Sequence, residues 1–201
     1  GELIARGTVD APIRFTSASH PTRAVTPGSW GEVRVDFGTV DLRYAIIEGS
    51  TRGLHLHFTS GSITDSIFRD NVDGTRIGES RMAVSRCLFS GHPGNGLNAR
   101  ASTNQVTSNW FRNNRRGIFL FEGDENSTIS GNWFSGNEVP FRLGDFYEGT
   151  VEISGNRWDD SLENVVAEGN ETAKLLVNPV DDVGPVGPVG LPLLTPVWAV
   201  A

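Results

Sequence analysis

Basic, amide and aromatic side chains alternate with apolar ones in five short segments of the chain. The segments are LHLHF (54–58), TRIG (75–78), LNAR (97–100), IFLF (118–121) and PFRL (140–143). If the apolar residues face a core, the outward residues are His55, His57, Arg76, Asn98, Arg100, Phe119, Phe121 and Arg142. Such groups hydrogen-bond hydroxyls and carboxylates, and sugar rings stack on phenylalanine. This pattern predicts a binding face for an acidic or neutral glycan. The alternative is that a loop, the C-terminal tail or a neighbouring subunit covers the two phenylalanines.

Metal chemistry has a weaker basis in the sequence. His55 and His57 lie two residues apart on one strand face, a spacing that allows shared ligation. No third ligand follows from the pattern, so we expect an ordinary surface pair and no metal site. Turn carboxylates would allow weak calcium binding, and no other cofactor is expected.

Catalytic residues do not converge in the sequence. If the protein were an enzyme, the candidates would be Asp70, Asp73 and Arg100. Inverting glycoside hydrolysis needs two carboxyl groups about 6.5–9.5 Å apart. The acidic residues instead fall in turns of different segments, with no Asp-Asp pair on one strand face. We therefore predict no catalytic residues, and keep a polysaccharide lyase or glycoside hydrolase as the alternative.

The composition indicates one turn-rich domain. The 201 residues include 24 glycines and one cysteine, and hydrophobic residues make up only 37%, which favours an all-β protein without disulfides. A net charge of −7 argues against a nucleic-acid partner. No segment approaches the ~20 consecutive apolar residues that a membrane-spanning helix needs.

An internal repeat of about 22 residues organises the chain. The string Asn-Trp-Phe occurs at 109–111 and again at 132–134. Its aromatic position continues as the series Ile47, Phe68, Phe89, Phe111, Phe134 and Trp158, with a β-branched series at Ile63, Val84, Val106, Ile129 and Val151. Each repeat holds three short apolar segments, too short for ordinary helices. Such a repeat predicts a coil that climbs one strand spacing, about 4.8 Å, per turn.

The first coil carries a family resemblance. LIARGTVDAPIRFTS (3–17) followed by PGSWGEV (27–33) resembles the opening coil of secreted bacterial β-helix repeat proteins, in the right-handed parallel β-helix or pectate-lyase-like superfamily. The resemblance implies an all-β, single-stranded right-handed parallel β-helix of about seven coils with three short strands per coil. It also implies an extracellular or cell-surface location, and a ligand groove along one parallel sheet. The superfamily includes lyases, hydrolases, epimerases and non-catalytic binders, so fold alone does not give function.

The repeat assigns the asparagines to structure. We expect two turn ladders, Ala45, Ser66, Cys87, Asn109, Asn132 and Asn156, and Ser50, Asn71, His92, Asn114, Asn137 and Ser161. Trp110 and Trp133 remain on the outward side. They would form either a stacked surface platform or a patch under the C-terminal tail.

Three regions are expected. Residues 1–161 form the β-helix, 162–183 a last partial coil or cap, and 184–201 a Pro/Gly spacer with an apolar C-terminal segment that packs on protein. We predict a non-catalytic extracellular or cell-surface module for glycan binding or surface assembly, with a polysaccharide or cell-surface glycan as partner. A further alternative is a subunit of an extracellular filament or appendage, which would self-associate or bind a protein through the β-helix ends and the tail.

Overall fold

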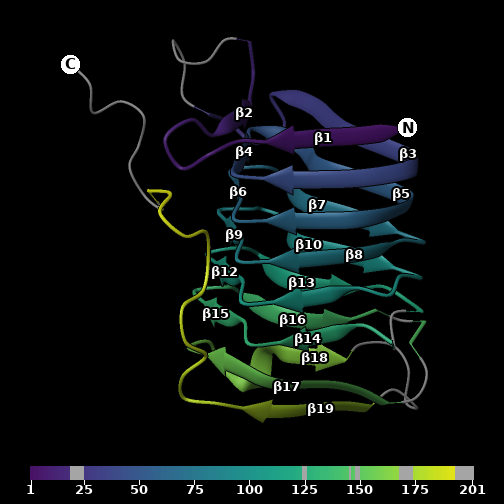
Figure 1. Ribbon diagram of the computed structural model, residues 1–201. Coiled ribbons are helices and arrows are strands. Elements are labelled where there is room, and N and C mark those ends of the chain that lie inside the picture. The colour runs from purple at the N-terminus through teal and green to yellow at the C-terminus, as the bar shows by residue number, and fades with distance from the viewer. Residues whose placement is uncertain (19–24, 124–125, 145, 148–149, 168–173, 193–201) are drawn as a thin grey trace.

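The chain folds as a parallel β-solenoid of about six turns, close to the number expected (Figure 1). The computed structural model describes residues 1–18, 25–123, 126–144, 146–147, 150–167 and 174–192. Their only helix is a 3-10 helix at Leu162–Asn164 (η1). The strands are Glu2–Arg6 (β1), Ile13–Phe15 (β2), Trp30–Arg43 (β3), Ala45–Glu48 (β4), Ser50–Thr64 (β5), Ile67–Arg69 (β6), Asp73–Gly78 (β7), Arg81–Ser85 (β8), Leu88–Ser90 (β9), Asn95–Arg100 (β10), Gln105–Thr107 (β11), Trp110–Arg112 (β12), Arg116–Leu120 (β13), Thr128–Ser130 (β14), Trp133–Ser135 (β15), Val139–Leu143 (β16), Thr150–Trp158 (β17), Val165–Ala167 (β18) and Lys174–Pro179 (β19).

The strands stack in three parallel layers around one core. The first stack contains the first halves of β3 and β5, then β7, β10, β13, β16 and β18. The second contains β1, the second halves of β3 and β5, then β8, β11 and β14. The third runs from β2 through β4, β6, β9, β12 and β15 to the end of β17, and β19 pairs with β17. Each turn therefore places a strand directly above its counterpart in the turn before it.

The predicted core series is confirmed. The ten residues that the sequence predicted to face inward on the first stack are all buried: Leu54, Leu56, Thr75, Ile77, Leu97, Ala99, Ile118, Leu120, Phe141 and Leu143. On the third stack the aromatic rings form a column, with centroid distances of 4.9 Å for Phe68–Phe89, 4.9 Å for Phe89–Phe111, 5.1 Å for Phe111–Phe134 and 4.2 Å for Phe134–Trp158. Identical positions in successive turns thus pack on one another and fill the core.

Both predicted asparagine ladders form inside the corners that flank the third stack. Asn109 Nδ2 donates to Asn132 Oδ1 at 3.0 Å, and Asn132 Nδ2 donates to Asn156 Oδ1 at 3.0 Å. In the other ladder, Asn114 Nδ2 donates to Asn137 Oδ1 at 2.9 Å. These bonds satisfy buried amide groups at the corners, where the sheet pairing is interrupted.

One member of the second ladder was predicted wrongly. Asn137 Nδ2 donates to Asp160 Oδ2 at 2.9 Å, and not to Ser161. Ser161 instead caps η1, where its hydroxyl accepts from the Glu163 amide. The last turn is one residue shorter at this corner because the chain enters the 3-10 helix there.

The corner between the first and second stacks depends on residues with left-handed backbone geometry. Phe37, Phe58, Glu79 and Ala101 occupy this corner in four successive turns, with φ between 49° and 53°. Such φ values cost L-residues about 1–2 kcal/mol each. β3 and β5 continue through the corner. Each of these two turns therefore has one long strand and one short one, β4 or β6, where the sequence predicted three short strands.

The two outward tryptophans stack on each other. The Trp110 and Trp133 rings lie 4.6 Å apart at an interplanar angle of 1°. The Arg157 guanidinium lies 4.6 Å from the Trp133 ring centre, one rung further on. Because each face of Trp133 is covered by Trp110 or Arg157, the pair does not offer an open stacking platform.

The C-terminal segment, as far as residue 192, packs on its own chain. After β19 it runs back along the third stack, as the yellow strap in Figure 1 shows. Leu191 is buried in a cluster with Ile46, Ile67 and Leu88, and Trp110 packs against this cluster. The Gly187 amide donates to the Ser108 carbonyl at 3.1 Å. We call residues 181–192 the strap; residues 193–201 lie outside the described part of the chain.

Leu191 is expected to hold the strap in place. Leu191→Ala should lower the free energy of unfolding by about 2 kcal/mol, because it removes a buried side chain from an apolar cluster. Leu176→Ala on β19 is the matched control, since Leu176 is 49% exposed and should cost under about 0.5 kcal/mol. Urea unfolding measures both variants, and equal effects would show that the strap contact does not stabilise the fold.

Candidate binding groove

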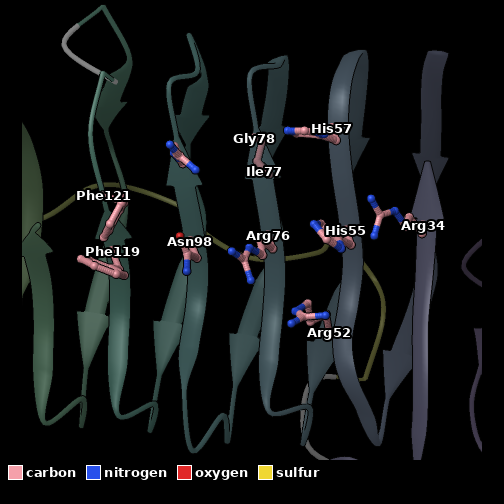
Figure 2. Close-up of a pocket in the computed structure, with 11 residues that line it drawn as sticks. Arg34, Arg52, His55, His57, Arg76, Ile77, Gly78, Asn98, Phe119 and Phe121 are labelled. Carbon is pink, nitrogen blue, oxygen red and sulfur yellow. The ribbon is translucent and has the colours of Figure 1, made fainter. Parts of the chain in front are cut away.

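A groove of about 640 Å³ lies on the outward face of the first stack. It crosses the strands from β3 to β13 (Figure 2). Its lining residues are Arg34, Arg52, His55, His57, Arg76, Ile77, Gly78, Asn98, Arg100, Phe119 and Phe121. Of the eight residues that the sequence placed on this face, all but Arg142 line the groove. Whether they bind a ligand stays a prediction.

Strand register explains why these residues meet. One row across the sheet contains Arg34, His55, Arg76, Asn98, Phe119 and Arg142, each paired with the next by backbone register. A second row, two residues further along the strands, contains His57, Gly78 and Arg100. Since parallel register repeats every turn, alternation in the sequence becomes a continuous row of outward side chains.

An aromatic corner closes one end of the groove. Phe119 and Phe121 lie 5.9 Å apart edge to face, and Phe146 lies 5.3 Å from Phe121. The Arg142 guanidinium lies 5.1 Å from the Phe119 ring centre. Arg142 thus lies outside the groove lining and contacts Phe119 from the next turn.

Two arginines of the groove were missed from the sequence. Arg34 lies on β3 beside His55, and Arg52 lies near the start of β5. The stretch GEVRVDF (31–37) alternates as the predicted segments do, and this signal would have extended the outward row by one turn.

Carboxylates balance most of these cations. Arg52 Nη1 donates to Glu32 Oε2 at 3.0 Å, and His55 Nδ1 lies 3.1 Å from the same oxygen. Arg34 Nε donates to Asp36 Oδ2 at 2.7 Å. Arg100 Nε donates to Glu122 Oε1 at 2.6 Å. The groove therefore presents hydrogen-bond donors and acceptors in matched pairs along its floor and rim.

The His55–Glu32 pair has defined protonation. Burial lowers the pKa of His55 below its ordinary value of 6.5, and the contact with Glu32 only partly offsets this. Burial by itself would raise the pKa of Glu32, but hydrogen bonds from Arg52 and His55 lower it overall. At pH 7 the imidazole is therefore neutral and the carboxylate is charged.

The three conditional catalytic residues do not come together. Asp73 Oδ1 accepts from the backbone and side-chain amides of Asn95, at 2.8 Å each, at the start of β10. Arg100 ends β10 five residues later, which is about 17 Å along an extended strand. Asp70 lies in the corner before β7, and burial raises its pKa above the ordinary value of 3.8.

Two further features concern metals and membranes. In the part of the chain that the structure describes, no three His, Cys, Asp or Glu side chains gather as a metal-binding group. His57 Nε2 lies 3.6 Å from Glu79 Oε1, and so points to a different partner from His55. None of the described helices has the length and hydrophobicity to span a membrane.

Comparison with known families agrees with this architecture. A family model described as a right-handed beta helix region matches residues 31–172, more than half of the chain. The chain belongs to the right-handed β-helix family. Membership in the pectate-lyase-like superfamily is consistent with this match. Searches of curated proteins and of solved structures found no match.

Family membership accounts for the fold of this right-handed β-helix, including the strands that carry the groove. The match covers every residue that lines the groove, from Arg34 to Phe121. Since β-helices host unrelated functions, the function must be argued from the side chains of the groove.

Proposed function

We propose that this right-handed β-helix is a non-catalytic module that binds glycan outside the cell or at its surface. The observation that carries the proposal is the groove itself, in which a row of polar side chains ends at an aromatic corner. Paired arginines and carboxylates hydrogen-bond sugar hydroxyls in both directions, and Phe119 offers a surface for a sugar ring. Rungs about 4.8 Å apart suit a linear chain that runs along the solenoid axis.

A glycan array, followed by calorimetric titration of the bound glycans, tests this proposal. Phe119→Ala should weaken binding about tenfold, because it removes a stacking surface. Phe37→Ala is the control, since Phe37 is an exposed phenylalanine outside the groove lining. Absence of glycan binding, or equal losses in both variants, would contradict the proposal.

One observation favours catalysis in the same groove as a second candidate. A neutral imidazole whose Nδ1 is held by a carboxylate can accept a proton at Nε2, and His55 has this arrangement with Glu32. Under our proposal, acidic polysaccharides should give neither new reducing ends nor the ultraviolet absorbance of unsaturated products. Turnover that disappears in His55→Gln would instead establish a lyase or hydrolase.

A further inference from the structure

Arg76 differs from the other arginines that line the groove. Arg34, Arg52 and Arg100 each have a carboxylate oxygen within 3.0 Å. For Arg76 the described residues provide no carboxylate within ion-pair distance, and its side chain is exposed. Arg76 is thus the one arginine of the groove lining that no carboxylate of the described residues balances.

The neighbours of Arg76 are uncharged. His55 and Asn98 flank it in the same row, from β5 and β10 (Figure 2). His55 is neutral at pH 7 for the reasons given above, and Asn98 carries an amide. The two nearest acidic residues on its own segment are engaged elsewhere, Asp73 with Asn95 and Glu79 beside His57. The Arg76 guanidinium therefore has only uncharged side chains beside it, at the middle of the row.

Such a position suits one carboxylate of a ligand. A guanidinium binds a carboxylate through two parallel hydrogen bonds, and this geometry is specific as well as strong. The amide of Asn98 lies one rung away and can donate to the same ligand group. An anion at Arg76 would gain a charge-assisted bond without displacing a carboxylate of the protein.

The rest of the groove opposes further anions. A ligand carboxylate beside Arg52 or Arg100 would lie next to Glu32 or Glu122, which already hold those arginines. Like charges at this distance repel each other. Hydroxyl groups meet no such penalty, since they both donate and accept hydrogen bonds.

We infer that the groove selects a glycan in which an acidic sugar is flanked by neutral ones, with the acidic carboxylate on Arg76. This inference rests on the proposed function and names its ligand class. Phe119 lies two rungs from Arg76, about 10 Å away, so the sugar that stacks there is separate from the acidic one. A polymer with a carboxylate on every sugar fits this groove less well.

Three octasaccharides of defined charge pattern test the inference. Hyaluronan carries a carboxylate on alternate sugars, oligogalacturonate carries one on every sugar, and carboxyl-reduced hyaluronan carries none. We expect hyaluronan to bind about tenfold or more tightly than its reduced form, and oligogalacturonate to bind no more tightly than hyaluronan. The affinity for hyaluronan should fall only modestly as salt rises, because salt screens a single exposed ion pair.

Two variants assign the effect to Arg76. Arg76→Gln should make hyaluronan and its reduced form bind equally, with little change for the reduced form. Arg100→Gln, the matched control, should weaken both by a similar factor, because Arg100 is already paired with Glu122. Circular dichroism spectra of both variants verify folding.

The outcomes separate this inference from the proposed function. Tightest binding of oligogalacturonate with a steep salt slope, or an unchanged preference in Arg76→Gln, would overturn the single-anion subsite and leave glycan binding intact. Binding of neutral glycans alone would also overturn the single-anion subsite and leave glycan binding intact. If neither these octasaccharides nor any glycan of the array binds, the proposed function itself is wrong.

Discussion

Phe111→Ala is expected to lower the free energy of unfolding by about 3–5 kcal/mol. Phe111 is fully buried and stacks between Phe89 and Phe134, so the substitution leaves a cavity in the middle of the aromatic column. Neighbouring turns cannot close the gap easily, because their spacing is fixed by the backbone pairing of three strands per turn. Chemical denaturation followed by circular dichroism measures the loss.

Phe37→Ala is the matched control for this prediction. Phe37 stacks on Phe58 at 4.7 Å but is 71% exposed, so the same substitution should cost under about 1 kcal/mol. A similar loss in both variants would mean that ring stacking between turns, and not burial in the core, determines the effect.

The stability of the protein is expected to fall by about 3 kcal/mol as pH decreases from 6.5 to 4, owing to His92 alone. Burial lowers the pKa of His92 from 6.5 to about 4. Between these values the unfolded chain binds a proton that the folded protein does not, so acid favours unfolding. Well above pH 6.5, by about one pH unit or more, His92 is neutral in both states and this contribution is constant.

His92→Asn should remove this pH dependence. His92 occupies a position where the adjacent turns have Asn71 and Asn114, and its Nδ1 lies 3.0 Å from the backbone carbonyl oxygen and 3.2 Å from the backbone amide nitrogen of Asn71. Its Nε2 is buried without a hydrogen-bond partner among the described residues. The difference between variant and wild-type stability, measured at pH 7 and pH 4, isolates this histidine from the carboxylates. A difference that does not change with pH would contradict the assignment.

The repeat in the sequence was sufficient to predict the core and both ladders, except for the last member of the second ladder, where Asp160 takes the place expected for Ser161. Because Phe68, Phe89 and Phe111 recur at nearly constant spacing, their burial and stacking follow from a coil of constant length. The corners were not predictable in the same way. Left-handed φ values favour glycine, yet Phe37, Phe58 and Ala101 adopt them, so these corners carry no local sequence signal.

Alternation likewise predicted which side chains face the groove, but not how they are paired. The row from His55 to Phe119 follows from period-two alternation. The Arg52–Glu32 and Arg100–Glu122 contacts join residues 20 and 22 positions apart, and depend on register and rotamers. Only these contacts reveal that Arg76 is the unbalanced cation, so the single-anion subsite could not be predicted from residue types.

The strap changes how this solenoid can unfold. A solenoid is close to a one-dimensional lattice in which each turn senses only its neighbours, and such arrays fray from their ends. The strap begins after β19 at one end, donates the Val189 amide to Asp65 part-way, and brings Gly190 against Val9 in the first turn. The strap therefore connects the last turn of the solenoid to the first turn. Loss of either terminal turn then disturbs a contact made by the other, and end-fraying becomes coupled to the unfolding of the whole.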